Sequence, residues 1–326
     1  MSTFRTLSRR FPIVLLALFA VSQATAQHLT WQKPVERDLA EIARITGSIE
    51  QREPSRDLNI VWVWGLDKFH GMNSHQYDWV MDRYVYDLLP NVPRVTVTPS
   101  YYFPKKELWE KADLVVFYMW PRHDGRGGFE DSVKHEGDLR GYWDYDIIDA
   151  YQKRGGGLVF LHMALQEGTG VELSKRIGLA WGHRDPSIPN THAGVLAWPV
   201  TVTSAGSASP ILKGLPDKFK FEDELYWPLV GDSAKVSTLA TSPAIPSTAG
   251  VASRKPPNYD ELDGKAWPVM WTTEVGEGKV FGTILGHNFF TFNDPLFRII
   301  LLRAMAWTMD ESFDPFKPLV TINLKQ

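Results

Sequence analysis

The stretch GGGLVFLHMAL, residues 155–165, decides the fold class of this chain. It consists of a glycine turn, a continuous apolar strand and the start of a helix, with His162 at the bend. A continuous apolar strand is typical of a parallel sheet that is buried on both faces. Sharp turns after such strands can expose a serine or cysteine nucleophile. The chain has no cysteine and no G-x-S-x-G motif, so His162 does not serve thiol or serine chemistry of that kind.

Strands and helices alternate on the N-terminal side of this stretch. Apolar runs predict strands, and segments with helical apolar spacing predict helices. Strands that are separated by helices pair in parallel, so we predict an α/β protein with a flavodoxin-like, doubly wound, mostly parallel sheet and helices on both faces. The predicted strands cover residues 59–65, 94–100, 113–120 and 155–162, and the predicted helices cover residues 76–89, 104–112 and 142–154.

The C-terminal half is less regular. A proline- and serine-rich stretch at residues 242–257 predicts a surface loop. Four further strands and a long, closing amphipathic helix are expected. The strands are expected at residues 195–204, 219–227, 268–275 and 279–287, and the helix at residues 293–311.

The N-terminus predicts a secretory signal peptide. Three arginines precede the apolar run FPIVLLALFAVS, and the small residues ATA follow it as a cleavage site. The apolar run is too short to span a bilayer. We therefore expect a signal peptide at residues 1–26, an N-terminal helical arm at 27–57, the α/β domain at 58–311 and a C-terminal tail at 312–326.

Export restricts the partners of the mature protein. Removal of the three arginines of the signal peptide changes the net charge from −3 to −6, because residues 1–26 carry no acidic residue. This acidic balance argues against nucleic acid as a partner. No later segment has the length of a membrane span, and a chain without cysteine has no lipoprotein anchor. We expect a periplasmic or secreted protein that is not membrane-bound after cleavage, and assembly into a homo-oligomer stays open.

Histidines gather at the predicted carboxyl edge of the sheet, where open α/β sheets bind ligands. A solitary loop histidine is more often a surface or hydrogen-bonded residue; this reading is favoured for His123 and His183, and His75 could cap a helix. His162 and His287 each end an apolar strand, where a polar side chain usually points into the ligand crevice. The histidines expected at this edge are His70, His75, His123, His162, His183, His192 and His287.

The segment FKFEDELYW, residues 219–227, adds carboxylates near this edge. Strict strand alternation places Asp223 on the apolar face, with Glu224 and Tyr226 on the other face. A carboxylate on an apolar face must be paired, must bind a metal or has a raised pKa. The alternative is that the strand ends or bulges near Glu222 and that water solvates the acidic residues.

Aromatic and glycine-rich motifs allow ligand-binding interpretations as well. Most of the 13 tryptophans fall in predicted strands or helices and are expected in the core. Trp120, Trp181 and Trp227 lie beside the predicted site and are candidates for contact with a ligand. The RGGG motif at 154–157 precedes its strand, whereas a dinucleotide-binding motif follows one. It therefore predicts a helix-to-strand turn, and we expect no nucleotide cofactor.

Three sequence blocks resemble those of the trehalose-utilisation (ThuA-like) family. They are GGGLVFLHMAL, SPILKGLPDKFKFEDELYW and PVMWTTEVGEGKVFGTILGHNFFTFNDPLFRIILLRAMAW, and the resemblance covers approximately residues 58–310. It implies the class I glutamine amidotransferase-like fold without that fold's cysteine, and therefore no amidotransferase activity. It also implies a role in carbohydrate catabolism, in pathways that oxidise a sugar to a 3-keto derivative and then cleave or rearrange it.

The resemblance also implies site residues. This chain departs from the family pattern at Met163, where a small polar residue is expected, in its long loop before PVMW and in its N-terminal arm. These departures affect the expected substrate preference more than the fold. The family's motifs fall on His70, His75, His162, Asp223, Glu224, Tyr226, Gly286 and His287.

Such a set suits a divalent metal ion. Two or three neutral imidazoles and a carboxylate can hold zinc, manganese or nickel, with an open position for water or for sugar oxygens. The candidate metal ligands are His70, His75, His162 and His287; the candidate catalytic residues are His162, Asp223, Glu224 and Tyr226; and the candidate substrate contacts are Trp120, His192 and Trp227.

Different classes of function stay open at this point. A metal would polarise a keto group, and Glu224 or a free histidine would move a proton, as in a lyase, hydrolase or isomerase of a keto-glycoside. Without a metal, His162 could act as acid or base at a helix N-terminus, which lowers the pKa of an imidazole. A non-catalytic sugar-binding or scaffold protein is the alternative. A separation above about 10 Å between His70, His162 and His287 would exclude a shared metal ion.

Overall fold

The computed structural model describes residues 35–50, 52–65, 74–121, 143–166, 169–182, 191–243 and 265–322, with the backbone alone for 191–196. The chain divides into two compact units, Met1–Lys33 and Pro34–Gln326, and every described residue belongs to the second unit. The predicted signal peptide and most of the predicted loop at 242–257 lie outside the described residues. None of the described helices is long and apolar enough to cross a membrane.

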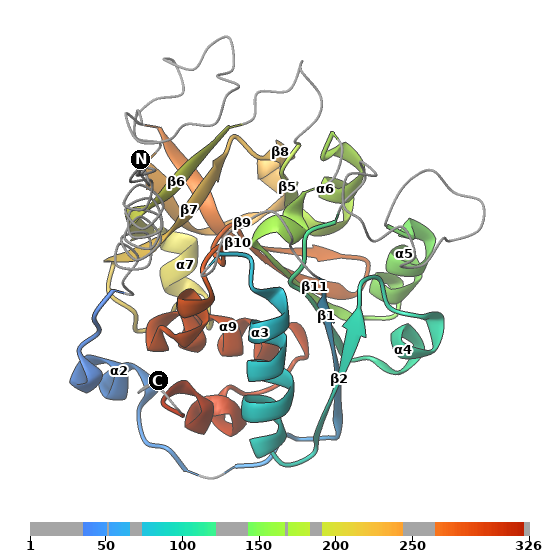
Figure 1. Cartoon of the computed structure of the whole chain (residues 1–326), viewed down its shortest axis with the longest axis horizontal. Helices are drawn as coiled ribbons and strands as arrows, with labels where there is room; N and C mark the ends of the chain where they lie inside the picture. The colour runs from blue at the N-terminus through green and yellow to red at the C-terminus, as the bar shows by residue number, and fades with distance from the viewer. Residues whose placement is uncertain are drawn as a thin grey trace, which may run out of the picture. The chain divides into compact units, whose positions relative to one another are not determined.

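A nine-stranded sheet forms the centre of the described unit (Figure 1). Five of its strands are parallel, in the order β2-β1-β3-β4-β11. This is the strand order of a flavodoxin-like, doubly wound sheet, so the predicted α/β class is confirmed. The parallel strands are β1 (Leu58–Trp64), β2 (Val95–Tyr101), β3 (Leu114–Phe117), β4 (Gly157–Leu161) and β11 (Gly278–Thr283).

The other half of the sheet is antiparallel, in the order β11-β10-β9-β6-β7. Strand β9 (Ser237–Pro243) is not predicted from the sequence, because the serines and proline of this segment are typical of turns. The sheet is therefore mixed, and strands were predicted at the positions of β6, β7 and β10 as well. The remaining strands are β6 (Thr191–Val202), β7 (Lys218–Trp227), β9 (Ser237–Pro243) and β10 (Ala266–Val275), while β5 (Leu179–Ala180) pairs with β8 (Val230–Gly231).

Helices cover both faces of the parallel strands, as predicted. Helices α3 and α9 lie side by side on one face, where α3 contacts β1 and α9 contacts β4 and β11, and α4 and α5 lie together on the other (Figure 1). The described α-helices are α2 (Leu39–Thr46), α3 (Tyr77–Asp82), α4 (Lys106–Lys111), α5 (Tyr145–Lys153), α6 (Val171–Ile177), α7 (Ser204–Ala208) and α9 (Pro295–Thr308).

Two predicted helices differ from expectation. Helix α9 is not amphipathic, because every residue except Arg303 and Trp307 is buried between the sheet and the elements outside it. Helix α3 ends early and continues as the π-helix η1 (Arg83–Leu88) and the 3₁₀ turn η2 (Leu89–Asn91). In η1, Tyr84 stacks on Trp62 of β1 at 4.7 Å between ring centres.

The RGGG motif is a helix-to-strand turn, as predicted. The backbone N–H groups of Gly155, Gly156 and Gly157 donate to the carbonyls of Gln152, Tyr151 and Asp113, respectively. All three donors are therefore engaged within the protein, so none of them is left to bind a phosphate group.

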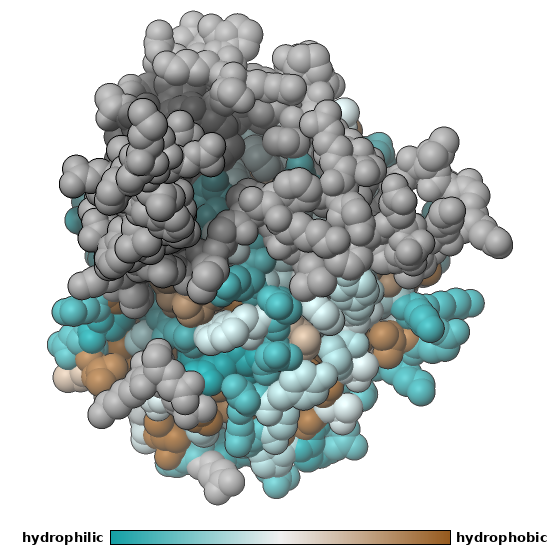
Figure 2. Space-filling model, in the orientation of Figure 1, coloured by the Kyte–Doolittle hydropathy of each residue, from teal (hydrophilic) through white to brown (hydrophobic). Residues whose placement is uncertain are grey.

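Hydrophilic residues dominate the described part of the face in Figure 2, and hydrophobic residues form small, separate patches there. The large hydrophobic side chains with high exposure are scattered as well, which is ordinary for a folded surface. The predicted C-terminal tail begins with the 3₁₀ helix η6 (Asp314–Val320), which packs on α9. Among the described residues, the most exposed large hydrophobic ones are Leu39, Ile49, Trp79, Tyr86 and Val171.

Arg37 joins the N-terminal arm to the sheet and to α9. Its guanidinium donates to both carboxylate oxygens of Asp294, at 2.7–3.0 Å, and to the carbonyl of Lys220 at 2.6 Å. It also lies 5.0 Å from the centre of the Phe221 ring. Burial raises the pKa of Asp294, and the hydrogen bonds and charge of Arg37 oppose that shift. Arg37 is thus the charged partner of a carboxylate that is buried at the N-cap of α9.

The Arg37→Ala variant is expected to lose about 3 kcal/mol of unfolding free energy, because Asp294 stays buried without its partner. Arg52→Ala is the matched control, since Arg52 pairs with Glu50 and Asp314 at an exposed site where an ion pair contributes little. Urea unfolding of both variants measures the difference. Equal unfolding midpoints for the two variants would contradict the anchoring role of Arg37.

Candidate metal centre

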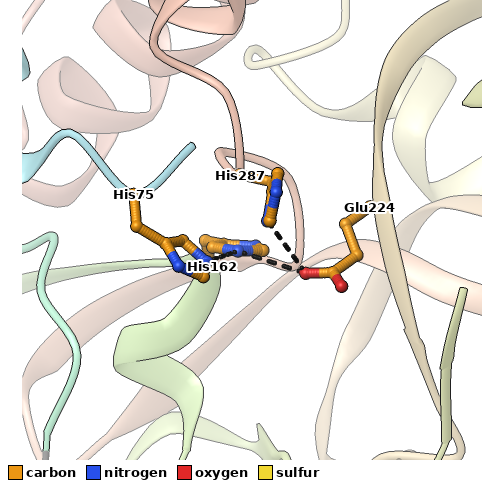
Figure 3. A group of neighbouring side chains, drawn as sticks. All are labelled: His75, His162, Glu224 and His287. Atoms are coloured by element: carbon orange, nitrogen blue, oxygen red, sulfur yellow. Dashed lines mark hydrogen bonds and ion pairs between the residues drawn. The ribbon is translucent and has the colours of Figure 1, made fainter. Parts of the chain in front are cut away.

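Four side chains from distant parts of the chain converge at the carboxyl ends of parallel strands (Figure 3). One donor atom of each lies within 4.8 Å of the other three. His75 lies between β1 and α3, His162 follows β4, His287 follows the end of β11, and Glu224 belongs to β7. The side chains of His75, His162 and Glu224 are buried, and that of His287 is partly exposed. The structure therefore brings three predicted histidines and one predicted carboxylate together.

His75 and His162 both adopt the left-handed backbone conformation, with φ values of 52° and 54°. This conformation is uncommon for residues other than glycine, and such strain gathers at functional sites. His162 starts the single 3₁₀ turn η3 (His162–Leu165), so the longer helix that was predicted at this bend is absent, and α6 begins only at Val171. In other α/β enzymes, a sharp bend of this kind presents a nucleophile. In this protein the bend presents the imidazole of His162.

A hydrogen bond to Ile284 fixes the tautomer of His162. Nδ1 of His162 lies 2.8 Å from the carbonyl oxygen of Ile284. Because a carbonyl only accepts, Nδ1 carries the proton and Nε2 of the neutral ring is unprotonated. Nε2 faces Nε2 of His75 at 2.9 Å and the hydroxyl of Tyr226 at 2.8 Å. Nε2 is therefore the atom of His162 that can bind a metal ion.

Burial lowers the pKa of His162 well below its usual range. His75 and His287 act in the same direction, because a second positive charge nearby disfavours protonation, whereas Glu224 acts against it. The sequence analysis attributed a lowered pKa to a helix N-terminus, but the main cause in the structure is burial. The imidazole is neutral at pH 7, which is the form that binds metal ions.

Glu224 connects two of the histidines with Tyr226. Its Oε2 lies 3.0 Å from Nδ1 of His287 and 3.5 Å from Nε2 of His162. The hydroxyl of Tyr226 donates to the same oxygen at 2.9 Å. Burial, and then the charge of Glu224, raises the pKa of Tyr226 well above its ordinary value, so this hydroxyl keeps its proton at neutral pH.

The ring of Tyr226 is held by its neighbours. It stacks on Trp181 with 4.2 Å between ring centres and on His162 with 4.9 Å. The sulfur of Met163 lies 3.0 Å from its hydroxyl. The departure from the family pattern at Met163 therefore lies in direct contact with the site.

Asp223 lies beside the cluster and is not a member of it. Its carboxylate accepts hydrogen bonds from the backbone N–H groups of Glu224, Gly286 and His287 and from the hydroxyl of Thr291, at 2.7–3.0 Å. Strand β7 continues through this position, with Asp223 buried as the alternation predicted. Burial raises the pKa of Asp223, and the hydrogen bond from Thr291 opposes this shift most. Asp223 is thus a paired, buried carboxylate.

The hydrogen bonds of Asp223 require the sheet to curl. Strands β10, β9 and β6 separate β7 from β11. In a flat sheet, four spacings of about 4.8 Å would place β7 about 19 Å from β11. Yet Asp223 of β7 lies within 3.0 Å of the backbone nitrogens of Gly286 and His287, which follow β11. The antiparallel half therefore bends over the carboxyl ends of the parallel strands and carries Glu224 to the histidines.

The donor set fits a divalent metal ion. Three imidazoles and one carboxylate suit zinc, nickel or manganese. Bonds of about 2.0–2.1 Å place neighbouring tetrahedral ligands about 3.3 Å apart. The three imidazole donors need only small side-chain movements to reach this spacing, since they already lie within 4.8 Å of one another, and the carboxylate of Glu224 lies beside them. Because Nε2 of His162 is unprotonated, Nε2 of His75 carries the proton between them, and a metal ion would replace that proton.

Trp120 and Trp227, both predicted substrate contacts, occupy different environments. Trp120 is partly buried, its ring centre lies 6.0 Å from that of His75, and its Nε1 donates to the side chain of Gln166 at 2.7 Å. Trp227 is only 1% exposed and belongs to the core. Trp120 is thus at the margin of the cluster, whereas Trp227 presents no ring face to a ligand.

The structure does not place the side chains of the other predicted histidines. The backbone of His192 in β6 pairs with that of Tyr226 in β7, and the structure describes no more of this residue. His70, His123 and His183 lie outside the described residues.

Sequence reasoning missed two contributors to the site. The carbonyl of Ile284, which fixes the tautomer of His162, is a backbone group and leaves no signal in side-chain patterns. Thr291, which donates to Asp223, lies four residues after His287 in NFFTFN. A single hydroxyl among buried phenylalanines was a signal that could have identified it, because a buried hydroxyl needs a partner.

The fold and the site define a class of protein. The flavodoxin-like strand order, the strained residue at the bend after β4 and the absence of cysteine identify a class I glutamine amidotransferase-like fold without the amidotransferase nucleophile. The family model described as trehalose utilisation, ThuA, matches residues 70–308. The chain therefore belongs to the ThuA family, which links it to carbohydrate utilisation. A comparison with curated proteins gave no match.

Solved structures are similar to this fold at low sequence identity. A ThuA-like protein from Parabacteroides merdae matches with a TM-score of 0.52 and 19% identity, over 78% of this chain and 90% of its own. A ThuA-like protein from Bacteroides uniformis matches with a TM-score of 0.53 and 15% identity, over 80% of this chain and 95% of its own. These similarities support the fold.

The neutral state of His162 predicts that acid destabilises the metal-free protein. An unfolded histidine titrates near pH 6.5 and the folded pKa is lower, so the unfolded state binds more protons below that pH. The contribution of His162 to the free energy of unfolding should be constant above about pH 6.5. Below that pH it should fall by up to about 1.4 kcal/mol per pH unit. Urea unfolding between about pH 7.5 and about pH 5.5 measures this slope. His162→Gln should reduce the slope, and an unchanged slope would refute the assignment.

Proposed function

We propose that this protein is an exported, metal-dependent enzyme of carbohydrate catabolism that acts on a keto-glycoside or a related sugar. The observation that carries the proposal is the convergence of His75, His162, Glu224 and His287 within 4.8 Å. An imidazole that burial keeps neutral, next to two others and a carboxylate, forms a donor set that suits a divalent cation. Membership in a trehalose-utilisation family supports the substrate class.

The three histidines would hold zinc, manganese or nickel and leave Glu224 available for proton transfer. The ion, when bound, would act as a Lewis acid that polarises a keto oxygen and acidifies the adjacent C–H group. Oε2 of Glu224 would accept the proton from that carbon. The hydroxyl of Tyr226 already donates to this oxygen and keeps its proton at neutral pH, so it holds Oε2 in place while Glu224 accepts the proton and then returns it to the product. Lyase-type cleavage, isomerisation and hydrolysis of a keto-glycoside can each begin with this proton transfer.

Trp120 supports a small-molecule carbohydrate as the partner. Its indole N–H is bound to Gln166, so the orientation of the ring is set before a ligand arrives. The ring is partly exposed beside His75. An aromatic face at this position offers a surface for the C–H groups of a sugar, while polar residues bind its oxygens.

The binding-protein alternative predicts dispersed histidines, and no described feature favours it. His75, His162 and His287 lie within reach of a single ion. His70, the other histidine of the predicted set, lies outside the described residues. We retain export to the periplasm or beyond as part of the proposal, on the strength of the N-terminal sequence.

Protein that is purified without chelator is expected to contain about one zinc, manganese or nickel ion per chain. His162→Ala and His287→Ala should lose the ion, because each removes one of three imidazole donors. Arg37→Ala is the control, since it weakens the fold without touching the cluster and should keep the metal. Elemental analysis reads the outcome. Absence of metal from the wild-type protein, even after metal is added back, would refute the proposal.

Trp120→Ala is expected to weaken binding of the 3-keto derivative of trehalose about tenfold, through loss of the aromatic face. The metal content should stay unchanged, because Trp120 supplies no ligand atom. Trp79→Ala is the matched control, since Trp79 is an exposed indole that packs on Phe289. Calorimetric titration of the metal-loaded protein measures the affinity. Equal affinities for the two variants would refute the role of Trp120.

A further inference from the structure

The carboxylate of Asp223 joins two members of the cluster through a single oxygen. Its Oδ1 accepts the backbone N–H of Glu224 at 2.8 Å and the backbone N–H of His287 at 2.9 Å. Its Oδ2 accepts the backbone N–H of Gly286 at 3.0 Å and the hydroxyl of Thr291 at 2.7 Å. One oxygen thus sets the distance between two cluster residues, and the other oxygen sets the rotation of the carboxylate.

Glu224 and His287 are not joined by the backbone hydrogen bonds that link neighbouring strands of a sheet. Strand β7 and the turn after β11 are not neighbours in the sheet, so no hydrogen-bonded ladder holds them together. Another described hydrogen bond, from the side chain of Asn288 to the carbonyl of Glu222, is longer at 3.3 Å. Asp223 therefore provides the main described link between the backbones of Glu224 and His287, beside the direct contact of 3.0 Å between Oε2 of Glu224 and Nδ1 of His287.

The same contacts argue against proton transfer or metal binding by Asp223 itself. An ionised carboxylate has about four lone-pair sites, and the four donors around Asp223 use them all. The residue is fully buried, and it is not among the donor atoms that converge. Asp223 therefore acts on the site through Glu224 and His287, whose backbone N–H groups it binds.

Glycine is required at position 286 for this arrangement. Its φ is +123°, a conformation that other residues rarely adopt. A Cβ atom there would lie 3.3 Å from Cβ of His162 and 3.2 Å from the ring of Phe292. The backbone that carries His287 therefore passes close to His162, and small displacements of this backbone change the spacing of the cluster.

We propose that Asp223 and Thr291 are positioning residues that set the spacing of Glu224 and His287 and thereby the metal affinity of the site. This inference rests on the metal site of the proposed function. Thr291 is 3% exposed, and its hydroxyl is the side-chain donor that holds the carboxylate of Asp223. Groups that orient metal ligands typically change metal affinity by about 10–100-fold when they are replaced.

The test compares Thr291→Val, which loses the hydroxyl at nearly constant volume, with Thr291→Ser, which keeps it. Thr308→Val is the matched control, because its buried hydroxyl bonds only to the carbonyl of Met305 within α9. Titration with cobalt chloride gives the affinity, and the visible spectrum of bound cobalt reports the ligand geometry. We expect about 10–100-fold weaker binding and an altered spectrum for Thr291→Val, with near-wild-type behaviour for Thr291→Ser and Thr308→Val.

A metal-free readout separates this inference from the proposed function. The imidazole ¹⁵N signals of His287 should shift in Thr291→Val and not in Thr308→Val. If wild-type protein binds no cobalt but this shift occurs, the metal site is wrong and the positioning of His287 stands. If both the cobalt affinity and the His287 signals are unchanged in Thr291→Val, the positioning role is overturned. Thr291→Ala takes the place of the valine variant should that variant fail to fold.

Discussion

A buried carboxylate in β7 joins the two halves of this sheet, and the site exists only where they meet. An ionised Asp223 in the core is costly unless each oxygen is hydrogen-bonded, and the raised pKa shows that burial still acts on it. Four donors compensate that cost, and three of them come from residues 286–291, which follow β11. Strand order alone would keep Glu224 away from the histidines. The closure of the sheet is thus the constraint from which the geometry of the cluster follows.

The bend after β4 shows how one backbone geometry can serve different chemistry. In enzymes with a nucleophile at this position, the strained turn exposes a reactive side chain. Here the same strain presents His162, whose Nδ1 is bound to the carbonyl of Ile284 and whose Nε2 faces the other cluster residues. The protein needs no hydroxyl or thiol for this arrangement. It needs a neutral ring in one tautomer, and burial together with one carbonyl provides both.

The parallel half of the sheet could be predicted from sequence because its central strands β3 and β4 are buried on both faces and read as continuous apolar runs. The convergence of His75, His162 and His287 was predictable for a related reason, since the carboxyl ends of parallel strands meet at one edge. Glu224 was expected at the site from the family resemblance, but its distance from the histidines was not predictable, because it depends on the curl of the antiparallel half. Strand β9 was not predicted because its composition resembles that of a loop. The burial of Trp227 was not predicted because its position at the end of a strand suggested an exposed side chain.

The contacts of Arg37 also bear on the order in which the chain becomes structured. Its partners lie far along the chain, with separations of 183 residues to Lys220 and 257 residues to Asp294. Contacts between such distant residues form late, because the intervening chain must first be ordered. During synthesis, which begins at the N-terminus, the arm would stay unattached until nearly all of the sequence had been made. The earliest segment of the domain would then be among the last to dock.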